Sequence, residues 1–400
     1  MINNDIYAKY KGRLIFSWVF IFLFFIIYNL LTKVGVIPKV FGGYYTFSIV
    51  LSSLFLGEVF FRHIFLSIQS ICTSSLSLAD VVNVLFLMFL LLFFCSVIFG
   101  YFGGANLDIV EPLFGAAIRF YLLYTICIYM PIKSPEFNKI CFVSFCVASV
   151  FILIFFAVGG NNFIFFEGLE QGLDNELNYQ GTALAYVLLT VFGVSYIKNS
   201  GIRILCWLIS LGLLFLIDSR SEFVLNFVVF LGLEFVLNKR RLMCFIWVVQ
   251  FALLAVFVCS FLFLIEYDFE INTRMRGLID ISTDESMLAR DDLKNLGLNT
   301  IQENLIFGDF ASYPPGQYIH NIFSSWVDLG FVGFFLLVLI FILCAIDGFF
   351  SKLTKERSIV FLLFVSCVLL LMLTKAYFYI LLPVVLGLFV WSYSRKFNKY

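Results

Sequence analysis

Charged residues and histidines are scarce in this 400-residue sequence. Charged residues make up 13% of the chain, against roughly 25% in soluble domains. There are only two histidines, His63 and His320, and the ten cysteines include no C-x-x-C pair. Since zinc, haem and iron–sulfur sites need denser sets of ligands, we expect no metal and no cofactor. The 26 basic residues balance the 26 acidic ones, so we expect no nucleic acid as a partner.

Apolar residues are abundant instead. They make up 62% of the chain and gather in runs longer than about 18 residues, the length that a helix needs to cross a bilayer. The first run, 14–31, exceeds the apolar core of a signal peptide and lacks a small-residue cleavage site, so we interpret it as a span. The sequence therefore predicts an all-α, polytopic integral membrane protein in the lipid bilayer, with residues 1–400 forming a single membrane domain.

We predict about twelve transmembrane helices from these runs. A further apolar stretch, 64–79, is rich in Ser, and we interpret it as a helix in the membrane interface. The predicted spans are 14–31, 41–61, 81–101, 113–131, 140–160, 179–197, 203–217, 221–237, 244–265, 322–345, 358–374 and 376–392.

Basic residues are distributed unevenly among the connections between these spans. If the N-terminus lies inside, 17 of the 26 Lys and Arg residues fall in inner segments and eight in outer ones, while Arg119 falls within a span. This distribution follows the positive-inside rule, so we expect both termini in the cytoplasm.

One connection is much longer than the others. Residues 266–321, between the ninth and tenth spans, form a periplasmic loop of 56 positions. Apolar residues recur in it at helical spacing and predict a helix over 286–302 that lies across the membrane surface, although Gly297 disfavours it. Loops of this length are usually functional or disordered, and the charged and aromatic residues of this one favour function.

Two arginines lie at or inside the predicted membrane boundary. Arg119 lies six residues from the outer end of the span 113–131, roughly 9 Å in at helical rise. A guanidinium at the centre of a span costs about 2.5–3.5 kcal/mol, so it normally faces protein or a water-filled cavity, unless it extends to the interface or pairs with an acid. Arg220 stands in the turn 218–221 between two apolar spans, either as a ligand-binding group or as a simple turn charge.

Two further candidates belong to the long outer loop. Arg290 is followed four positions later by Lys294, which places both on one face of the predicted helix, either as a binding surface or as a solvated face. His320 opens the tenth span, where it can exchange a proton near neutral pH or simply pack at the interface. Asp328, eight positions on, is expected near the same helical face, where it would pair with His320 or act as a base itself.

Four of these residues come from distant parts of the sequence, yet the predicted topology places all of them at or near the outer leaflet. They are Arg119, Arg220, Arg290 and His320. Several guanidinium groups beside one titratable group suit a lipid-linked pyrophosphate, because Arg binds phosphate oxygens in pairs and keeps its charge. We therefore expect Arg119, Arg220 and Arg290 to bind pyrophosphate and His320 to be catalytic.

The second half of the chain also carries short motifs in a definite order. They are Asn-Tyr-Gln-Gly-Thr-Ala at 178–183, Asp-Ser-Arg-Ser at 218–221, Ile-Gln-Glu-Asn-Leu-Ile-Phe-Gly at 301–308 and Tyr-Ile-His-Asn at 318–321, followed by Gly330 and Gly333. This order resembles that of the O-antigen polymerase (Wzy) and O-antigen ligase (WaaL) superfamily. The first half of the chain resembles these proteins only in hydropathy.

The resemblance implies a metal-independent glycosyltransferase at the periplasmic face of a bacterial inner membrane. Its donor would be an undecaprenyl-pyrophosphate-linked oligosaccharide, and its partners would include a polysaccharide chain-length regulator. Arg220 and Arg290 would contact the lipid pyrophosphate, and His320 would belong to the active centre. Two positions depart from the usual pattern, because Ser221 replaces a Gly or Ala and Phe310 replaces a second glycine.

Two alternative functions stay open. A ligase would use the same donor but pass the glycan to lipid A–core, and we favour the polymerase because polymerases are the more divergent group. A lipid-linked oligosaccharide flippase or transporter would explain Arg119 and the many spans. However, the single long loop breaks the internal symmetry that is typical of transporters, and transport would leave that loop without a role.

Overall fold

The computed structural model shows a chain built of α-helices. It describes residues 4–33, 35–38, 43–72, 77–159, 179–217, 219–237, 285–314, 318–350 and 354–394. Most of these residues are helical and none lies in a strand, which confirms the predicted all-α class. A helix satisfies its own backbone N–H and C=O groups, as a bilayer without hydrogen-bonding partners requires.

Six described helices are long and apolar enough to cross a membrane, or seven if one bent pair counts as a single span. Three shorter helices are also apolar, and together they support a multi-pass membrane protein. The predicted span 244–265 lies outside the described residues, so the count of twelve stays a prediction. The six helices are Lys9–Lys33, Leu78–Phe102, Leu107–Ile128, Pro135–Ala157, Ser324–Phe350 and Lys355–Leu373.

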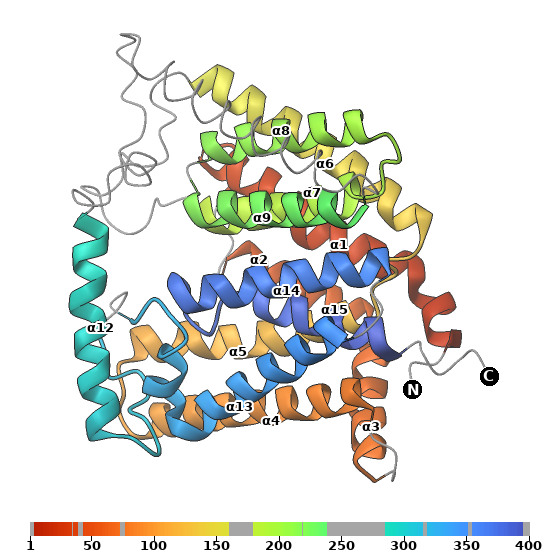
Figure 1. The fold of residues 1–400 in the computed structure, drawn as a ribbon. Helices are drawn as coiled ribbons and strands as arrows, with labels where there is room; N and C mark the ends of the chain where they lie inside the picture. The colour runs from red at the N-terminus through yellow and green to blue at the C-terminus, as the bar shows by residue number, and fades with distance from the viewer. Residues whose placement is uncertain are drawn as a thin grey trace. The chain divides into compact units, whose positions relative to one another are not determined.

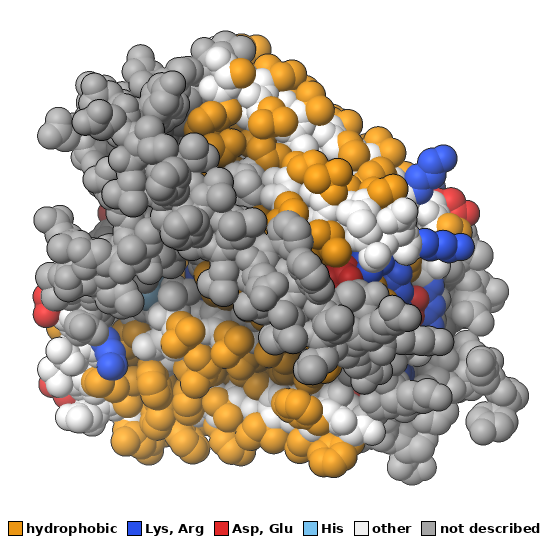
Figure 2. Space-filling model, turned by 45° about the horizontal axis from the view of Figure 1, so that its top comes forward, with side chains coloured by type: hydrophobic (Ala, Val, Ile, Leu, Met, Phe, Trp, Pro, Cys, Tyr) orange, Lys and Arg blue, Asp and Glu red, His pale blue; other side chains and the backbone are white. Residues whose placement is uncertain are grey.

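Helix α4 (Leu78–Phe102) shows a surface suited to lipid. One face buries Phe86, Phe89 and Phe93, while Phe99 and Phe102 on the outside are 75% and 81% exposed. Figure 2 shows hydrophobic side chains over much of the described surface, with charged side chains in small groups. A helix that is apolar on both its packed and its outward faces is typical of a membrane span.

The described helices form two compact units, and α1 (Asn4–Lys33) contributes its first part to one and its second part to the other. In the first unit, α5 packs against α4 and α15, and α13 packs against α4. Figure 1 shows α12 running across the ends of α4, α5 and α13, and α12 confirms the helix predicted over 286–302. The other helices of this unit are α2 (Tyr44–Phe55), α3 (Gly57–Cys72), α5 (Leu107–Ile128), α12 (Glu285–Glu303), α13 (Ser324–Phe350), α14 (Lys355–Leu373) and α15 (Leu381–Ser394).

Helices α2 and α3 meet at a bend of 78°. The chain therefore bends inside the predicted span 41–61, and α3 continues through the predicted boundary between that span and the interfacial helix over 64–79. The Leu56 N–H bonds to the Ser52 carbonyl and ends α2 in a tight turn, and Gly57, a poor helix former, follows at the start of α3.

Buried polar side chains join α3, α4 and α5. His63 on α3 is 4% exposed, and its Nε2 lies 3.2 Å from Oδ1 of Asn83 on α4. The Tyr124 hydroxyl of α5 donates to the same Oδ1 at 2.7 Å, and the Asn83 amide donates to the Ser67 hydroxyl at 3.0 Å. His63 thus lies in a hydrogen-bonded network inside the first unit.

The second unit surrounds a buried helix, α7. Every residue of α7 from Gly181 to Val194 is buried, and the helix packs against α6, α8 and α9. Because α7 carries few polar side chains, its neighbours pack around it mainly through apolar contacts. The helices of this unit, besides the second part of α1, are α6 (Pro135–Gly159), α7 (Tyr179–Val194), α8 (Ser200–Leu216) and α9 (Arg220–Leu237).

An ion pair with both side chains buried joins α8 to α9 at the end of the hairpin opposite their connecting turn. The Arg203 guanidinium donates to both carboxylate oxygens of Glu234, through Nη2 at 2.8 Å and through Nε, and Nη1 donates to the Ile197 carbonyl at 2.7 Å. The two side chains are 5% and 3% exposed. The two buried charges therefore compensate each other.

Removing one member of this pair tests its role in the fold. Glu234→Ala should lower the free energy of unfolding by about 3–5 kcal/mol, because it leaves a buried guanidinium without its carboxylate. Chemical denaturation in detergent micelles measures this loss. The double variant Arg203→Met with Glu234→Leu should recover most of it, and a double variant no more stable than the single one would contradict this account.

Candidate functional site

The segment between α12 and α13 folds back along the start of α13. The Asp309 N–H donates to the Val327 carbonyl at 2.6 Å, and the Trp326 indole N–H donates to the Leu305 carbonyl at 2.9 Å. The loop motif at 301–308 and the residue after it therefore lie against the first turns of a membrane helix.

Gly297 allows close packing between α12 and this segment. A Cβ at Gly297 would come within 1.9 Å of the Ile319 Cδ1, so a larger residue would displace Ile319, the neighbour of His320. Ile319 packs in a small core with Ile301 and Val327. The glycine that disfavours the helix in the sequence thus lies where the helix contacts the segment that carries His320.

Two glycines with positive φ lie in contact where this segment crosses α13. Gly308 has a φ of 70°, and Gly330 interrupts α13 with a φ of 67°. A Cβ on Gly330 would lie 2.1 Å from the Ile306 carbonyl oxygen, and one on Gly308 would lie 2.5 Å from the Val327 carbonyl oxygen. Both positions therefore require glycine, for conformation and for space.

Phe310, which replaces the second glycine of the usual motif, packs against α4. A Cβ on Gly100 would come within 2.6 Å of a Phe310 ring carbon, so the ring lies directly over that glycine. Phe310 therefore joins the loop to the end of a neighbouring helix.

Asp328 lies in the second turn of α13 and is 1% exposed. Its Oδ1 accepts from the Ala311 N–H at 3.2 Å, and its Oδ2 accepts from the Tyr313 hydroxyl at 3.1 Å. Burial, together with the adjacent Asp328, raises the pKa of Tyr313 above its ordinary value, so this hydroxyl keeps its proton and donates. The predicted helical spacing of His320 and Asp328 is wrong, because α13 begins only at Ser324.

His320 lies in the non-helical segment before α13, among aromatic rings. Its ring centre is 4.5 Å from that of Tyr318, which is 5.0 Å from Phe378 and 6.3 Å from Tyr313. The Tyr377 N–H donates to the Ser324 hydroxyl at 3.1 Å and joins the turn between α14 and α15 to the start of α13. His320 is half-buried, so its ring is accessible in part.

Arg119 lies deeper in its helix than the sequence indicates. Helix α5 begins at Leu107, six residues before the predicted span, because the Asn106 side chain caps it by accepting from the Asp108 N–H. Arg119 is therefore roughly 18 Å from the first residue of the helix. Its Nη1 donates to the Thr46 hydroxyl of α2 at 2.8 Å, and no carboxylate pairs with it among the described residues.

Arg220 is the first residue of α9, four positions after the end of α8 at Leu216, and Asp218 of the predicted turn lies outside the described residues. The Ser221 hydroxyl donates to the carboxylate of Glu222 at 2.7 Å, and the Ser219 hydroxyl donates to the same oxygen. Glu222 is wholly buried, so the hydroxyls of this motif fix the start of α9 from both sides of Arg220.

The four sequence-predicted residues divide between the two units. Arg119 and His320 belong to the first unit, as does Arg290 on α12, whose side chain lies outside the described residues. Arg220 belongs to the second unit. The convergence of all four at one site therefore stays a prediction. No group of three or more potential metal ligands occurs in the described part of the chain, and the metal-independent site also stays a prediction.

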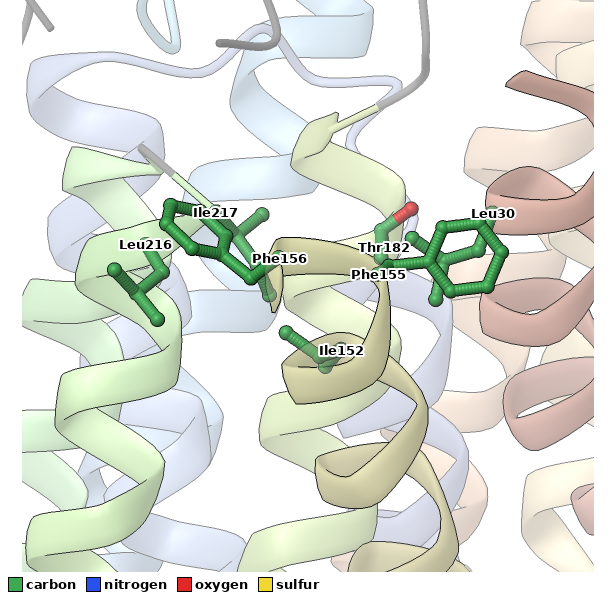
Figure 3. Close-up of a pocket in the computed structure, with 7 residues that line it drawn as sticks. All are labelled: Leu30, Ile152, Phe155, Phe156, Thr182, Leu216 and Ile217. Carbon is green, nitrogen blue, oxygen red and sulfur yellow. The ribbon is translucent and has the colours of Figure 1, made fainter. Parts of the chain in front are cut away.

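The second unit contains a small apolar pocket with a volume of about 10 Å³, enough for roughly one water molecule. Figure 3 shows side chains from four helices around it, with the Thr182 hydroxyl as the only side-chain oxygen. Thr182 also accepts a hydrogen bond from Asn29 at 2.9 Å. The pocket is lined by Leu30, Ile152, Phe155, Phe156, Thr182, Leu216 and Ile217.

Sequence reasoning did not identify the aromatic residues around His320. Tyr313 and Tyr318 belong to the long loop before the predicted tenth span, and Phe378 belongs to a turn about 60 positions away. Contacts over such separations depend on helix packing, which a single apolar sequence does not specify.

No protein-family model matches this sequence, and no curated protein matches it. The likeness to O-antigen polymerases and ligases rests on the order of its short motifs, and the functions that it implies stay predictions.

Substitution of Gly330 tests how much its close packing contributes to stability, and Gly104 in the same unit offers a control. Gly330→Ala should cost about 2–5 kcal/mol of unfolding free energy, from a strained φ and from a Cβ directed at a backbone carbonyl. Gly104 also has a positive φ, of 81°, but nothing lies within 4 Å of its would-be Cβ. Gly104→Ala should therefore cost only about 1–2 kcal/mol. Equal losses in thermal or chemical denaturation would show that the packed crossing contributes nothing.

Proposed function

We propose that this chain is a membrane glycosyltransferase that polymerises a surface polysaccharide. It joins repeat units carried on polyprenyl pyrophosphate at the periplasmic face of a bacterial inner membrane, with both termini in the cytoplasm. The observation that carries the proposal is the setting of His320. It lies in a non-helical segment between α12 and α13, and backbone hydrogen bonds hold this segment against the start of α13. A histidine that only packs against lipid does not need such a segment.

The proposed reaction replaces one glycosidic bond by another. A hydroxyl oxygen of the acceptor repeat unit forms a bond to the anomeric carbon of the donor glycan. The bond from that carbon to the pyrophosphate oxygen breaks, and polyprenyl pyrophosphate leaves with the electron pair. His320 takes the proton of the attacking hydroxyl, as a general base does near neutral pH.

The leaving pyrophosphate needs positive groups where its negative charge develops. Arg220 is suited to bind the pyrophosphate because it is the first residue of α9, where backbone N–H groups also favour an anion. Arg290 on α12 supplies the second guanidinium of the proposed clamp.

Arg119 suits a third contact with the same anion. Its guanidinium is half-buried on α5 and has the Thr46 hydroxyl as its described hydrogen-bond partner. A cation inside a membrane helix without a carboxylate usually faces a cavity or a ligand. A polyanionic headgroup would supply the missing negative charge.

Deletion of the gene in its host, followed by gel analysis of the surface polysaccharide, tests the proposal. Core bearing one repeat unit, restored to a ladder by the wild type but not by Arg290→Ala, would indicate a polymerase. The matched variant Arg62→Ala removes an exposed arginine paired with Glu58 and should restore the ladder. Bare core with polymer retained on the lipid carrier would indicate a ligase instead. An unchanged ladder would contradict both and leave the transporter alternative open.

Arg220→Lys tests whether the clamp depends on guanidinium geometry. Lysine keeps the charge but cannot bind two phosphate oxygens in parallel, so polymerisation by the purified protein should fall at least about tenfold. The measurement is the rate at which short lipid-linked repeat units are extended. Full activity in Arg220→Lys, with Arg62→Lys as the control, would contradict the clamp.

A further inference from the structure

Asp328 is a buried carboxyl group that the proposed reaction does not use. It lies in the first unit, near the start of α13 and eight positions after His320, and both of its oxygens accept hydrogen bonds. With 1% of its surface exposed, it offers no face to a substrate. Burying a carboxyl group is costly unless it is fully hydrogen-bonded, so the groups that surround it indicate its role.

The hydrogen-bond partners of Asp328 come from another part of the chain. Ala311 and Tyr313, which donate to it, belong to the loop after α12. The carboxyl group thus joins α13 to this loop, and the turn between α14 and α15 is joined to the same end of α13 by the Tyr377 N–H, which donates to the Ser324 hydroxyl.

Backbone strain at Ala311 shows how firmly the loop is held. Ala311 has a φ of 57° and is the one residue other than glycine with a positive φ in the described part of the chain. This conformation costs a residue with a Cβ about 1–2 kcal/mol. Its N–H points at the Asp328 carboxyl group, which favours the strained conformation over relaxed alternatives.

Aromatic contacts lead from the Asp328 partners to His320. The Tyr313 ring is 6.3 Å from Tyr318, and the Tyr377 ring is 5.3 Å from Phe378, which is 5.0 Å from Tyr318. Tyr318 in turn lies 4.5 Å from His320. The loop that donates to the Asp328 carboxyl and the turn between α14 and α15 therefore both contact the ring on which His320 rests.

We infer that Asp328 is a positioning residue, which fixes the orientation of His320 through Tyr313 and Tyr318. The inference rests on the proposed function for its effect on catalysis, but the orientation of His320 can be measured separately. It replaces the idea that Asp328 is itself a base, since no reacting atom reaches its enclosed oxygens.

The presence of only two histidines allows a direct readout. Protein labelled with ¹⁵N-histidine in nanodiscs gives two sets of ring signals, and His320→Asn identifies which set belongs to His320. In Asp328→Asn the His320 signals should shift and titrate at a different pH, while the His63 signals stay in place. Asp80→Asn is the matched control, because it removes a carboxylate that caps α4 and should leave both sets unchanged.

Activity gives a second readout that separates positioning from folding. Asp328→Asn should lower kcat at least about tenfold and change the donor KM by less than about twofold, since the binding groups are untouched. Tyr313→Phe keeps the ring against Tyr318 and removes only the hydroxyl, so it should shift the His320 signals in the same direction by a smaller amount. This variant decides the question if Asp328→Asn does not fold.

The outcomes distinguish the inference from the proposed function. Unchanged His320 signals in a folded Asp328→Asn or Tyr313→Phe protein would overturn the positioning role. Shifted His320 signals in a wild-type background that transfers no glycan would support positioning and reject the glycosyltransferase. Equal shifts at His63 and His320 would indicate general loosening and would also overturn the inference.

Discussion

The lack of hydrogen-bonding partners in a bilayer is the constraint on which this structure depends. Helices satisfy it within themselves, so any break needs a partner from elsewhere in the protein. At Gly330 the break in α13 is satisfied by the loop after α12, since the Phe331 N–H donates to the Ile306 carbonyl at 3.1 Å. The irregular segment that carries His320 and the irregular point of a long apolar helix therefore stabilise each other.

The sequence was sufficient for the class of the fold and for several helix positions. Uninterrupted Leu and Phe runs predict helices whatever their neighbours are, and the periodicity over 286–302 predicted α12. The break at Leu56 was missed because the run 41–61 is apolar on both sides of it. The Asp328 contacts were missed because they join residues that only tertiary packing brings together, and the predicted helix at His320 gave the wrong geometry.

Two guanidinium groups inside the helical units illustrate different uses of charge. Arg203 is held by both oxygens of Glu234, so its charge is neutralised within the protein and serves the hairpin of α8 and α9. Arg119 donates to the neutral Thr46 hydroxyl and pairs with no carboxylate among the described residues, and the proposed function assigns its charge to an anion from outside the chain. The chemistry of the partner, rather than the depth of the side chain, separates a structural arginine from a candidate binding group.

The hydrogen bonds around His63 bear on how a chain so rich in Phe and Leu avoids alternative packings. Apolar side chains of similar size can interdigitate in more than one register, because sliding one helix by a turn exchanges one hydrocarbon contact for another. The Asn83 amide meets His63, Ser67 and Tyr124 at a single axial offset of α3, α4 and α5. Any other offset would leave these groups unpaired in hydrocarbon, so the network selects one alignment of the three helices.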